Sequence, residues 1–247
     1  LYVSDRENHL IRKIDTSGNV TTFAGSGTSG SSDGQGTVAS FNKPSGMAFD
    51  SSGSLYVADR SNHKIRKIDS FGNVTTVAGT GNTGSVNGQG TSASFNQPID
   101  VVLDPSGNIY VSDHKNHKIR KIDTSGNVTT LAGSGSGSFA DGRGTSASFN
   151  YTTGIAIDSA GNLYVGDYYN HRIRKIDPSG NVTTYAGITG GGSADGYRTS
   201  ASFYSPTDVN LDSFGNIYVA DHKNHVIRKI DSNGNVTTIA GSGSIGS

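Results

Sequence analysis

Residues 55–69 read LYVADRSNHKIRKID, and near-copies of this segment begin at Leu1, Ile109, Leu163 and Ile217. Each start lies 54 residues after the one before it. A fixed period of this length indicates supersecondary units that stack on one another, because a single unit cannot bury its own apolar face. The repeat therefore predicts the architecture, whereas the activity has no comparable signature in the sequence.

Within a unit, short apolar and aromatic segments alternate with turns rich in Asp and Gly. In the second unit these segments are 55–58, 64–68, 74–78 and 99–103, and they predict strands. An Asp that bonds the backbone beyond it, followed by a Gly free to take positive φ, is typical of a hairpin turn, as in residues 69–73. Short antiparallel strands repeated around an axis predict an all-β fold, a β-propeller of four-stranded blades.

An Asn-His pair recurs in every unit between Tyr-Val-X-Asp and an Ile-Arg-Lys-Ile-Asp segment. The copies are Asn8-His9, Asn62-His63, Asn116-His117, Asn170-His171 and Asn224-His225. With this motif the whole chain resembles the NHL-repeat family, in particular its long bacterial form, whose units also carry an Asp-Gly-X-Gly-Thr-X-Ala-Ser-Phe loop. The resemblance implies a propeller that serves mostly as a binding scaffold, with a minority of enzymes.

The resemblance also implies that strands a, b, c and d follow one another from an inner channel outward. Strand a is then expected at 46–49, 100–103, 154–157 and 208–211, which is four copies against five of every other strand. The result is nineteen strands in five repeat units, the first of which lacks its inner strand. We expect a single domain over residues 1–247 within a longer chain. The ring could be completed by a sixth blade, or five blades could close imperfectly or with a strand from a partner.

Composition limits the classes of partner. Twenty basic and twenty acidic side chains give zero formal charge, which argues against a nucleic-acid partner. The chain has no cysteine, so disulfides and thiolate metal sites are excluded. No apolar run approaches the ~20 residues that span a membrane, so no membrane insertion is expected. Low charge and many Ser, Thr and Gly residues suit a secreted bacterial protein, extracellular or at the cell surface, with the periplasm as an alternative.

Residues repeated in every unit are interpreted as structural. Each unit carries charges equivalent to Asp59, Arg66, Lys67 and Asp69, which balance one another. Arg and Lys can lay their aliphatic stems between blades while their charged ends meet carboxylates. The Asn-His pair is interpreted as a turn-stabilising element, because a residue needed in every blade serves packing that every blade shares.

Positions at which the copies differ are the better candidates for function. If strand a runs down from an upper face, the variable b–c turns and d–a loops lie on that face, and the near-uniform c–d turns lie on the lower one. The binding candidates are Arg6, Arg60, His114, Tyr168, Tyr169 and His222 in the b–c turns, Lys43, Gln97 and Tyr151 just before strand a, and Tyr197 and Arg198 in the last d–a loop. Exposed tyrosines commonly hold sugars or peptides, so a protein, peptide or glycan partner is expected.

Two other functions stay open. A structural spacer or adhesin module of a cell-surface protein would bind no partner on this face. A metal-dependent lyase or lactonase is the other alternative, because some NHL-related propellers resemble such enzymes and hold zinc or calcium at the channel. Glu7 is the only glutamate and lies in a b–c turn, which disfavours a glutamate-based channel site.

Several side chains could nevertheless ligate a metal. His114 and His222 each begin a His-X-X-His pair, and Asp100, Asp208 and Asn210 are expected to line the channel. Three such oxygen donors fall short of the ~6–8 that calcium takes. Asp-Gly loops such as the one at Asp33 could also take calcium. We expect no catalytic residues, no enzymatic activity and no cofactor, with calcium as the alternative.

Overall fold

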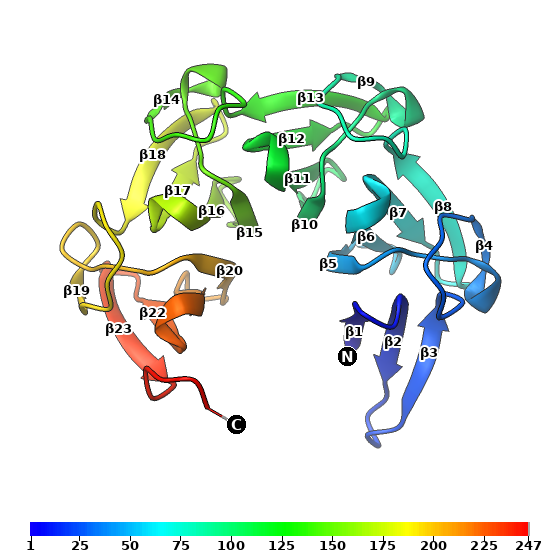
Figure 1. The fold of residues 1–247 in the computed structure, drawn as a ribbon, viewed down its shortest axis with the longest axis horizontal. Coiled ribbons are helices and arrows are strands. Elements are labelled where there is room, and N and C mark those ends of the chain that lie inside the picture. The colour runs from blue at the N-terminus through cyan, green and yellow to red at the C-terminus, as the bar shows by residue number, and fades with distance from the viewer. Residues whose placement is uncertain (247) are drawn as a thin grey trace. The chain divides into compact units, whose positions relative to one another are not determined.

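A computed structural model describes residues 1–246 as 23 β-strands and seven short 3₁₀ helices (Figure 1). The strands are β1 (Tyr2–Asp5), β2 (Leu10–Ile14), β3 (Val20–Ala24), β4 (Gly34–Gln35), β5 (Pro44–Phe49), β6 (Leu55–Asp59), β7 (Lys64–Ile68), β8 (Asn73–Ala78), β9 (Gly88–Gln89), β10 (Pro98–Leu103), β11 (Ile109–Asp113), β12 (Lys118–Ile122), β13 (Asn127–Ala132), β14 (Gly142–Arg143), β15 (Thr152–Ile157), β16 (Leu163–Asp167), β17 (Arg172–Ile176), β18 (Asn181–Ala186), β19 (Gly196–Tyr197), β20 (Pro206–Leu211), β21 (Ile217–Asp221), β22 (Val226–Ile230) and β23 (Asn235–Ala240). The 3₁₀ helices are η1 (Gly36–Val38), η2 (Arg60–Asn62), η3 (Gly90–Ser92), η4 (His114–Asn116), η5 (Gly144–Ser146), η6 (Tyr168–Asn170) and η7 (His222–Asn224).

The strands form five sheets, which we call blades 1 to 5 in chain order. Blade 1 has the order β1-β2-β3, and the others are β4-β8-β7-β6-β5, β10-β11-β12-β13-β9, β14-β18-β17-β16-β15 and β19-β23-β22-β21-β20. Neighbouring strands pair antiparallel, for example Leu55 with Ile68 and Tyr56 with Lys67. The predicted all-β propeller class of antiparallel blades is confirmed, and so is the first blade without an inner strand.

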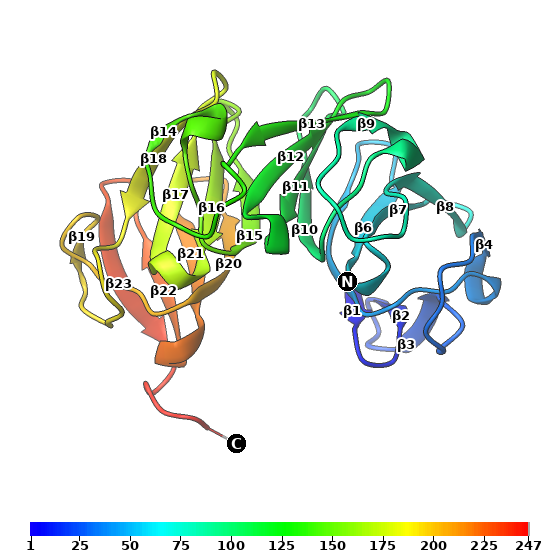
Figure 2. The same cartoon turned by 45° about the horizontal axis from the view of Figure 1, so that its top comes forward.

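Four strands of only two residues were not predicted, and they raise the count from nineteen to 23. Each lies in an Asp-Gly or Asn-Gly loop and pairs with the outermost long strand of its blade, as β4 does with β8 and β19 with β23 (Figure 2). Each inner strand also begins two residues earlier than predicted, since β5 runs from Pro44 to Phe49. The loop before each inner strand therefore covers the outer edge of the blade, where an unpaired strand would otherwise be exposed.

The chain divides into two compact units. Unit 1 comprises Leu1–Asn116 with Arg120–Thr129, and unit 2 comprises His117–Ile119 with the described residues from Thr130 onward. The boundary falls within β12 and β13, so blades 1 and 2 belong to unit 1 and blades 4 and 5 to unit 2. That residues 1–247 form a single domain stays a prediction.

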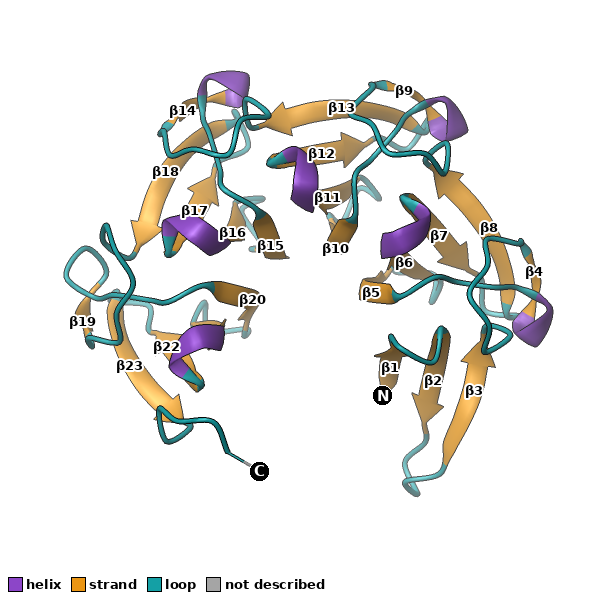
Figure 3. Cartoon of the chain, in the orientation of Figure 1, coloured by secondary structure: helices purple, strands orange, loops and turns teal. Residues whose placement is uncertain are grey.

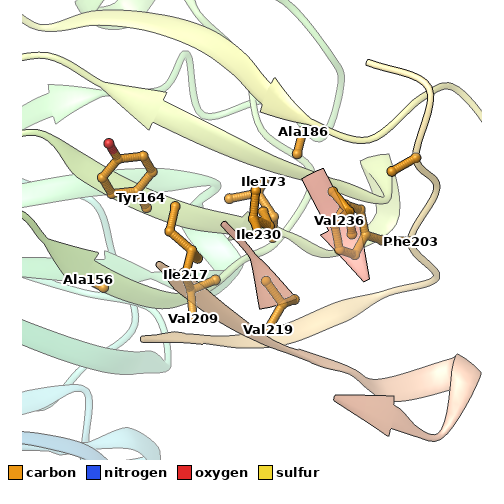
Figure 4. Packing of buried hydrophobic residues seen from close by; sticks show 11 residues of the cluster. Ala156, Tyr164, Ile173, Ala186, Phe203, Val209, Ile217, Val219, Ile230 and Val236 are labelled. Carbon is orange, nitrogen blue, oxygen red and sulfur yellow. The ribbon is translucent and has the colours of Figure 1, made fainter. Parts of the chain in front are cut away.

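The core of each unit is a thin apolar layer between consecutive blades. In unit 2, Ile173 and Ala186 of blade 4 share one buried cluster with Phe203, Val219 and Val236 of blade 5 (Figure 4). Unit 1 repeats this arrangement with a cluster that contains the equivalent residues of blades 1 and 2. Burial of one such side chain stabilises the fold by about 1.5–3 kcal/mol.

A fully buried arginine fastens each outer loop to its blade. In blade 2, Nη1 of Arg66 donates to Oδ2 of Asp59 at 2.7 Å, and Nη2 donates to Oδ1 of Asp33 at 2.7 Å. The guanidinium also lies 5.2 Å from the centre of the Phe41 ring. Arg174 and Arg228 repeat this arrangement, whereas Arg120 bonds Asp113 in the same way and the amide oxygen of Asn87 in its loop. The predicted meeting of arginine heads with carboxylates is confirmed, and Arg66 takes the Asp33 oxygen that a calcium loop would need.

Candidate ligand-binding face

The b–c turns have one backbone design in several blades. In blade 2, η2 follows Asp59, and His63 ends the helix in the left-handed conformation with φ 55° (Figure 3). The amide Nδ2 of Asn62 donates to Oδ2 of Asp59 at 2.8 Å and to the Gly30 carbonyl at 2.6 Å. Blades 4 and 5 have the same arrangement around η6 and η7. The Asn-His pair thus stabilises the turn, as predicted.

The histidine of this pair has a second role that the sequence did not suggest. Nδ1 of His63 accepts a hydrogen bond of 3.0 Å from the backbone N–H of Gln97, the residue just before the next inner strand. The same bond joins His9 to Lys43, His117 to Tyr151 and His171 to Ser205. Burial lowers the pKa of His63, His117 and His171, which favours the neutral ring that can accept at Nδ1.

In unit 1 the predicted candidates form a polar cluster around the only glutamate. Nζ of Lys43 lies 2.8 Å from Oε2 of Glu7, and Nε of Arg6 lies 3.7 Å from its other oxygen. The Lys43 hydrogen bond lowers the pKa of Glu7. Arg60 donates to Oε1 of Gln97 at 3.2 Å, and its pKa is lowered by burial and then by the charge of Arg6. Three cations and one carboxylate make this surface basic.

In unit 2 the corresponding turns carry aromatic side chains that touch one another. The ring centres of Tyr151 and Tyr169 lie 5.3 Å apart, and those of Tyr169 and Tyr168 lie 4.7 Å apart, both edge to face. The ring centre of Tyr168 lies 6.4 Å from that of His222. We call these four residues the tyrosine row. At the end of the row opposite His222, the Tyr151 ring centre lies 4.6 Å from that of His117, and Tyr169 is 51% exposed.

Tyr197 and Arg198 do not lie with the tyrosine row, and their predicted placement on the upper face is wrong. Tyr197 is in the short strand β19 and pairs with Asn235, at the c–d turn of blade 5. The Arg198 N–H donates to the carbonyl of Gly234 in that turn, and its guanidinium lies 4.2 Å from the centre of the Tyr185 ring. The prediction failed because it treated the d–a loop as belonging wholly to one face, whereas β19 carries it along the blade edge.

The metal candidates are engaged in local contacts. Oδ1 of Asp208 accepts from the Val209 N–H at 2.9 Å, and Oδ2 accepts from the Asn210 amide at 3.2 Å. Gly154 occupies the position of β15 that Asp208 occupies in β20. A Cβ at Gly154 would overlap the Asp208 carboxylate, which explains the glycine at that position. Asp100 similarly accepts from the Val101 N–H at 2.8 Å. Among residues 1–246, no three His, Asp or Glu side chains come together as a metal site, and His114 lies in η4.

The sequence model of the NHL repeat matches residues 41–68, 95–122 and 149–176. Each match runs from the loop phenylalanine through the three inner strands of a blade. The protein SUPPRESSOR OF QUENCHING 1, chloroplastic, of Arabidopsis thaliana is 32% identical over 94% of this chain, and human NHL repeat-containing protein 2 is 31% identical over 94%.

The chain belongs to the NHL-repeat β-propeller family. It spans about a quarter of the Arabidopsis relative's length, 24%, and 37% of the human one. None of the helices in residues 1–246 is long and apolar enough to cross a membrane.

Solved structures share the NHL-type fold at low sequence identity. A protein of unknown function from Bacteroides thetaiotaomicron superimposes with a TM-score of 0.69 at 21% identity, covering 95% of this chain and 55% of its own. An auxiliary nutrient binding protein from the same organism gives 0.66 at 19%, covering 96% and 65%. Virginiamycin B lyase from Staphylococcus aureus gives 0.60 at 15%, covering 96% and 65%. The fold is therefore common to binding proteins and to enzymes.

Proposed function

We propose that this NHL-repeat chain is a non-enzymatic binding module, and that its ligand, a protein, peptide or glycan, binds the face of the b–c turns. The observation that carries the proposal is the tyrosine row. Its rings stand on turns fixed by the Asn170–Asp167 hydrogen bond and by the link from Tyr151 to His117. Tyrosines held in this way offer flat apolar faces and polar tips with little entropy left to lose on binding.

Comparison with blade 2 supports a role in binding rather than in folding. Tyr168 and Tyr169 stand where blade 2 has Arg60 and Ser61, and both turns keep the same helix and the same left-handed histidine. The turn therefore forms without aromatic side chains. Because the backbone of the turn does not require the two tyrosines, their presence supports a role in contacting a ligand.

The proposal has two further parts, the absence of catalysis and the location of the protein. Absence of catalysis is favoured by the engagement of Glu7 with Lys43 and of the Asp208 oxygens within their own strand. An extracellular or cell-surface location is favoured by the charged fraction of only 16% and the 35 glycines. One structural neighbour is described as a nutrient binding protein, which is compatible with a binding role on this fold.

The test is a binding screen of the whole chain against a glycan array and a displayed library of random peptides. Hits are then measured with Tyr169→Ser, which installs the residue that blade 2 has at this position. The control is Tyr197→Ser, since Tyr197 is 54% exposed and lies away from the row. We expect Tyr169→Ser to weaken binding ~10-fold or more and the control to leave it unchanged. Equal effects of both changes, or no saturable ligand, would contradict the proposal.

A further inference from the structure

The phenol hydroxyls distinguish the tyrosine row from the structural tyrosines of the chain. In the a–b turns, the hydroxyls of Tyr110, Tyr164 and Tyr218 each donate to Oδ2 of the turn aspartate, at 3.0, 3.2 and 3.2 Å. The hydroxyls of Tyr168 and Tyr169 make no hydrogen bond to any group within residues 1–246. The row therefore carries two polar tips that the fold itself does not use.

The position that could bond the Tyr168 hydroxyl holds a small residue. In blade 2, Nη2 of Arg60 donates to Oε1 of Gln97 at 3.2 Å. Two repeats further along the chain, the same two positions hold Tyr168 and Ser205. Ser205 is 0% exposed, and its own hydroxyl has no hydrogen-bond partner in the part of the chain that the structure describes. The contact that the chain provides for Arg60 is thus not provided for Tyr168.

The backbone of the row is closed to strand pairing. The Tyr151 N–H donates to Nδ1 of His117 at 2.9 Å, and the N–H groups of Tyr168 and Tyr169 donate to the carbonyls of Tyr151 and Asn150, each at 3.1 Å. A peptide that adds to a protein as an extended strand gains affinity from main-chain hydrogen bonds. The three tyrosines offer only rings and hydroxyls, which disfavours that mode of recognition.

The three tyrosines also present no formal charge. In unit 1 the equivalent positions hold Lys43, Arg60 and Ser61, two of which are cations. The aspartate that precedes the turn of the row, Asp167, is 0% exposed and meets Arg174 at 2.7 Å. An anionic or a cationic ligand would therefore find no opposite charge on the three tyrosines.

We propose that the ligand of the tyrosine row is a neutral glycan and not a peptide. A pyranose sugar presents C–H groups on its faces and hydroxyls around its edge, so it matches flat rings with polar tips. The Tyr169 ring, 51% exposed, packs against the C–H face of a sugar, and the hydroxyls of Tyr168 and Tyr169 bond the hydroxyls at its edge. This inference rests on the proposed function, because it names the ligand class of the same face.

The test is an array of uncharged gluco-, manno-, galacto- and xylo-oligosaccharides, followed by titration calorimetry of the whole chain with each one that binds. Tyr169→Phe keeps the ring and removes the hydroxyl, and it should weaken binding ~3-fold or more. Tyr169→Ser removes both and should weaken binding ~10-fold or more. Tyr197→Phe is the matched control and should leave binding unchanged, because Tyr197 is 54% exposed and lies in β19, away from the row.

Charged glycans test the argument from charge. Heparin fragments and oligogalacturonate should bind no more tightly than the best uncharged oligosaccharide, because the three tyrosines provide no ion pair. Tighter binding of either one, weakened by added salt and by Tyr169→Ser, would overturn the proposal, since the site would then select an anion.

The remaining outcomes separate this inference from the proposed function. A displayed peptide that binds the parent chain and loses affinity in Tyr169→Ser, with no oligosaccharide bound, would overturn the glycan and leave the binding face in place. Absence of any saturable ligand, or glycan binding that Tyr169→Ser leaves unchanged, would overturn both.

Discussion

The b–c turns of blades 2 and 4 have the same backbone and different surfaces. His63 and His171 end them at φ 55° and 56°, and each turn's asparagine donates to the aspartate three residues earlier at 2.8 and 2.9 Å. Blade 2 then presents Arg60 and Ser61, whereas blade 4 presents two tyrosines. The residues that build the turn are therefore distinct from those that it displays, and the two sets can be perturbed separately.

The largest effect on stability is expected at the buried arginines. They bond the aspartate of the turn and therefore belong to the residues that build it. Arg174→Ala would leave the Asp167 carboxylate, 0% exposed, without the charge that it meets at 2.7 Å. Loss of one partner of a buried pair costs about 3–5 kcal/mol. Urea unfolding should show this loss, while the exposed Arg143→Ala in the same unit should stay within ~0.5 kcal/mol of the parent. Similar values for the two variants would mean that the buried pair does not stabilise the blade.

An intermediate effect is expected at the turn asparagine. Asn62→Ala removes both donations, to Asp59 at 2.8 Å and to Gly30 at 2.6 Å, and leaves Arg66 as the remaining donor to that oxygen of Asp59. The expected cost is about 1–3 kcal/mol in the free energy of unfolding. Ser61→Ala changes the neighbouring displayed residue and should cost less than ~0.5 kcal/mol. If Ser61→Ala proved as harmful, the two sets would not be separable.

The histidine links predict a pH dependence. Burial lowers the pKa of His63, His117 and His171 from the ordinary value of 6.5, so the unfolded chain binds protons more readily than the folded one. Their contribution to stability is fully present above pH 6.5 and is lost as the pH falls below it toward the lowered values. Chemical unfolding at several pH values between ~7 and ~5 should show this decline.

A matched variant assigns the decline to a histidine. His171→Asn keeps a residue that tolerates positive φ and removes one titrating group, so the slope of stability against pH should become smaller. The Asp69 carboxylate of the c–d turn does not contribute to this decline, because hydrogen bonds from Asn73 lower its pKa from an ordinary value of 3.8 that already lies below this window. A flat profile through pH 6.5 would contradict the assignment.

The smallest effect is expected at the displayed ion pair. Glu7 and Lys43 meet at 2.8 Å, but their side chains are 69% and 39% exposed, so water and salt screen their attraction. Glu7→Gln should leave the midpoint of urea unfolding unchanged within error. A clear destabilisation would mean that Glu7 helps to build the turn and is not merely displayed by it.

The sequence predicted the blades because each long strand has its own apolar segment, which can be compared with a copy 54 residues away. It missed β4 and its equivalents because two residues such as Gly34-Gln35 carry no periodicity. It grouped Tyr151, Tyr168, Tyr169 and His222, whose rings lie beside one another in the structure. It misplaced Tyr197, because the position of β19 depends on backbone pairing with β23.

The link from each histidine to the next inner strand was also missed. It joins residues 34 apart, such as His63 and Gln97, and its donor is a backbone N–H that looks the same in any sequence. The only available signal was that the histidine, unlike the residue after it, is identical in all five copies.

The most direct test of the separation is a double substitution that gives blade 4 the displayed residues of blade 2, Tyr168→Arg with Tyr169→Ser. Its free energy of unfolding should be measured beside that of the parent chain. We predict agreement within ~0.5 kcal/mol, because the substituted side chains are not part of the turn scaffold. A loss of ~2 kcal/mol or more, the size expected for buried packing, would contradict the account by making the tyrosine row part of the fold.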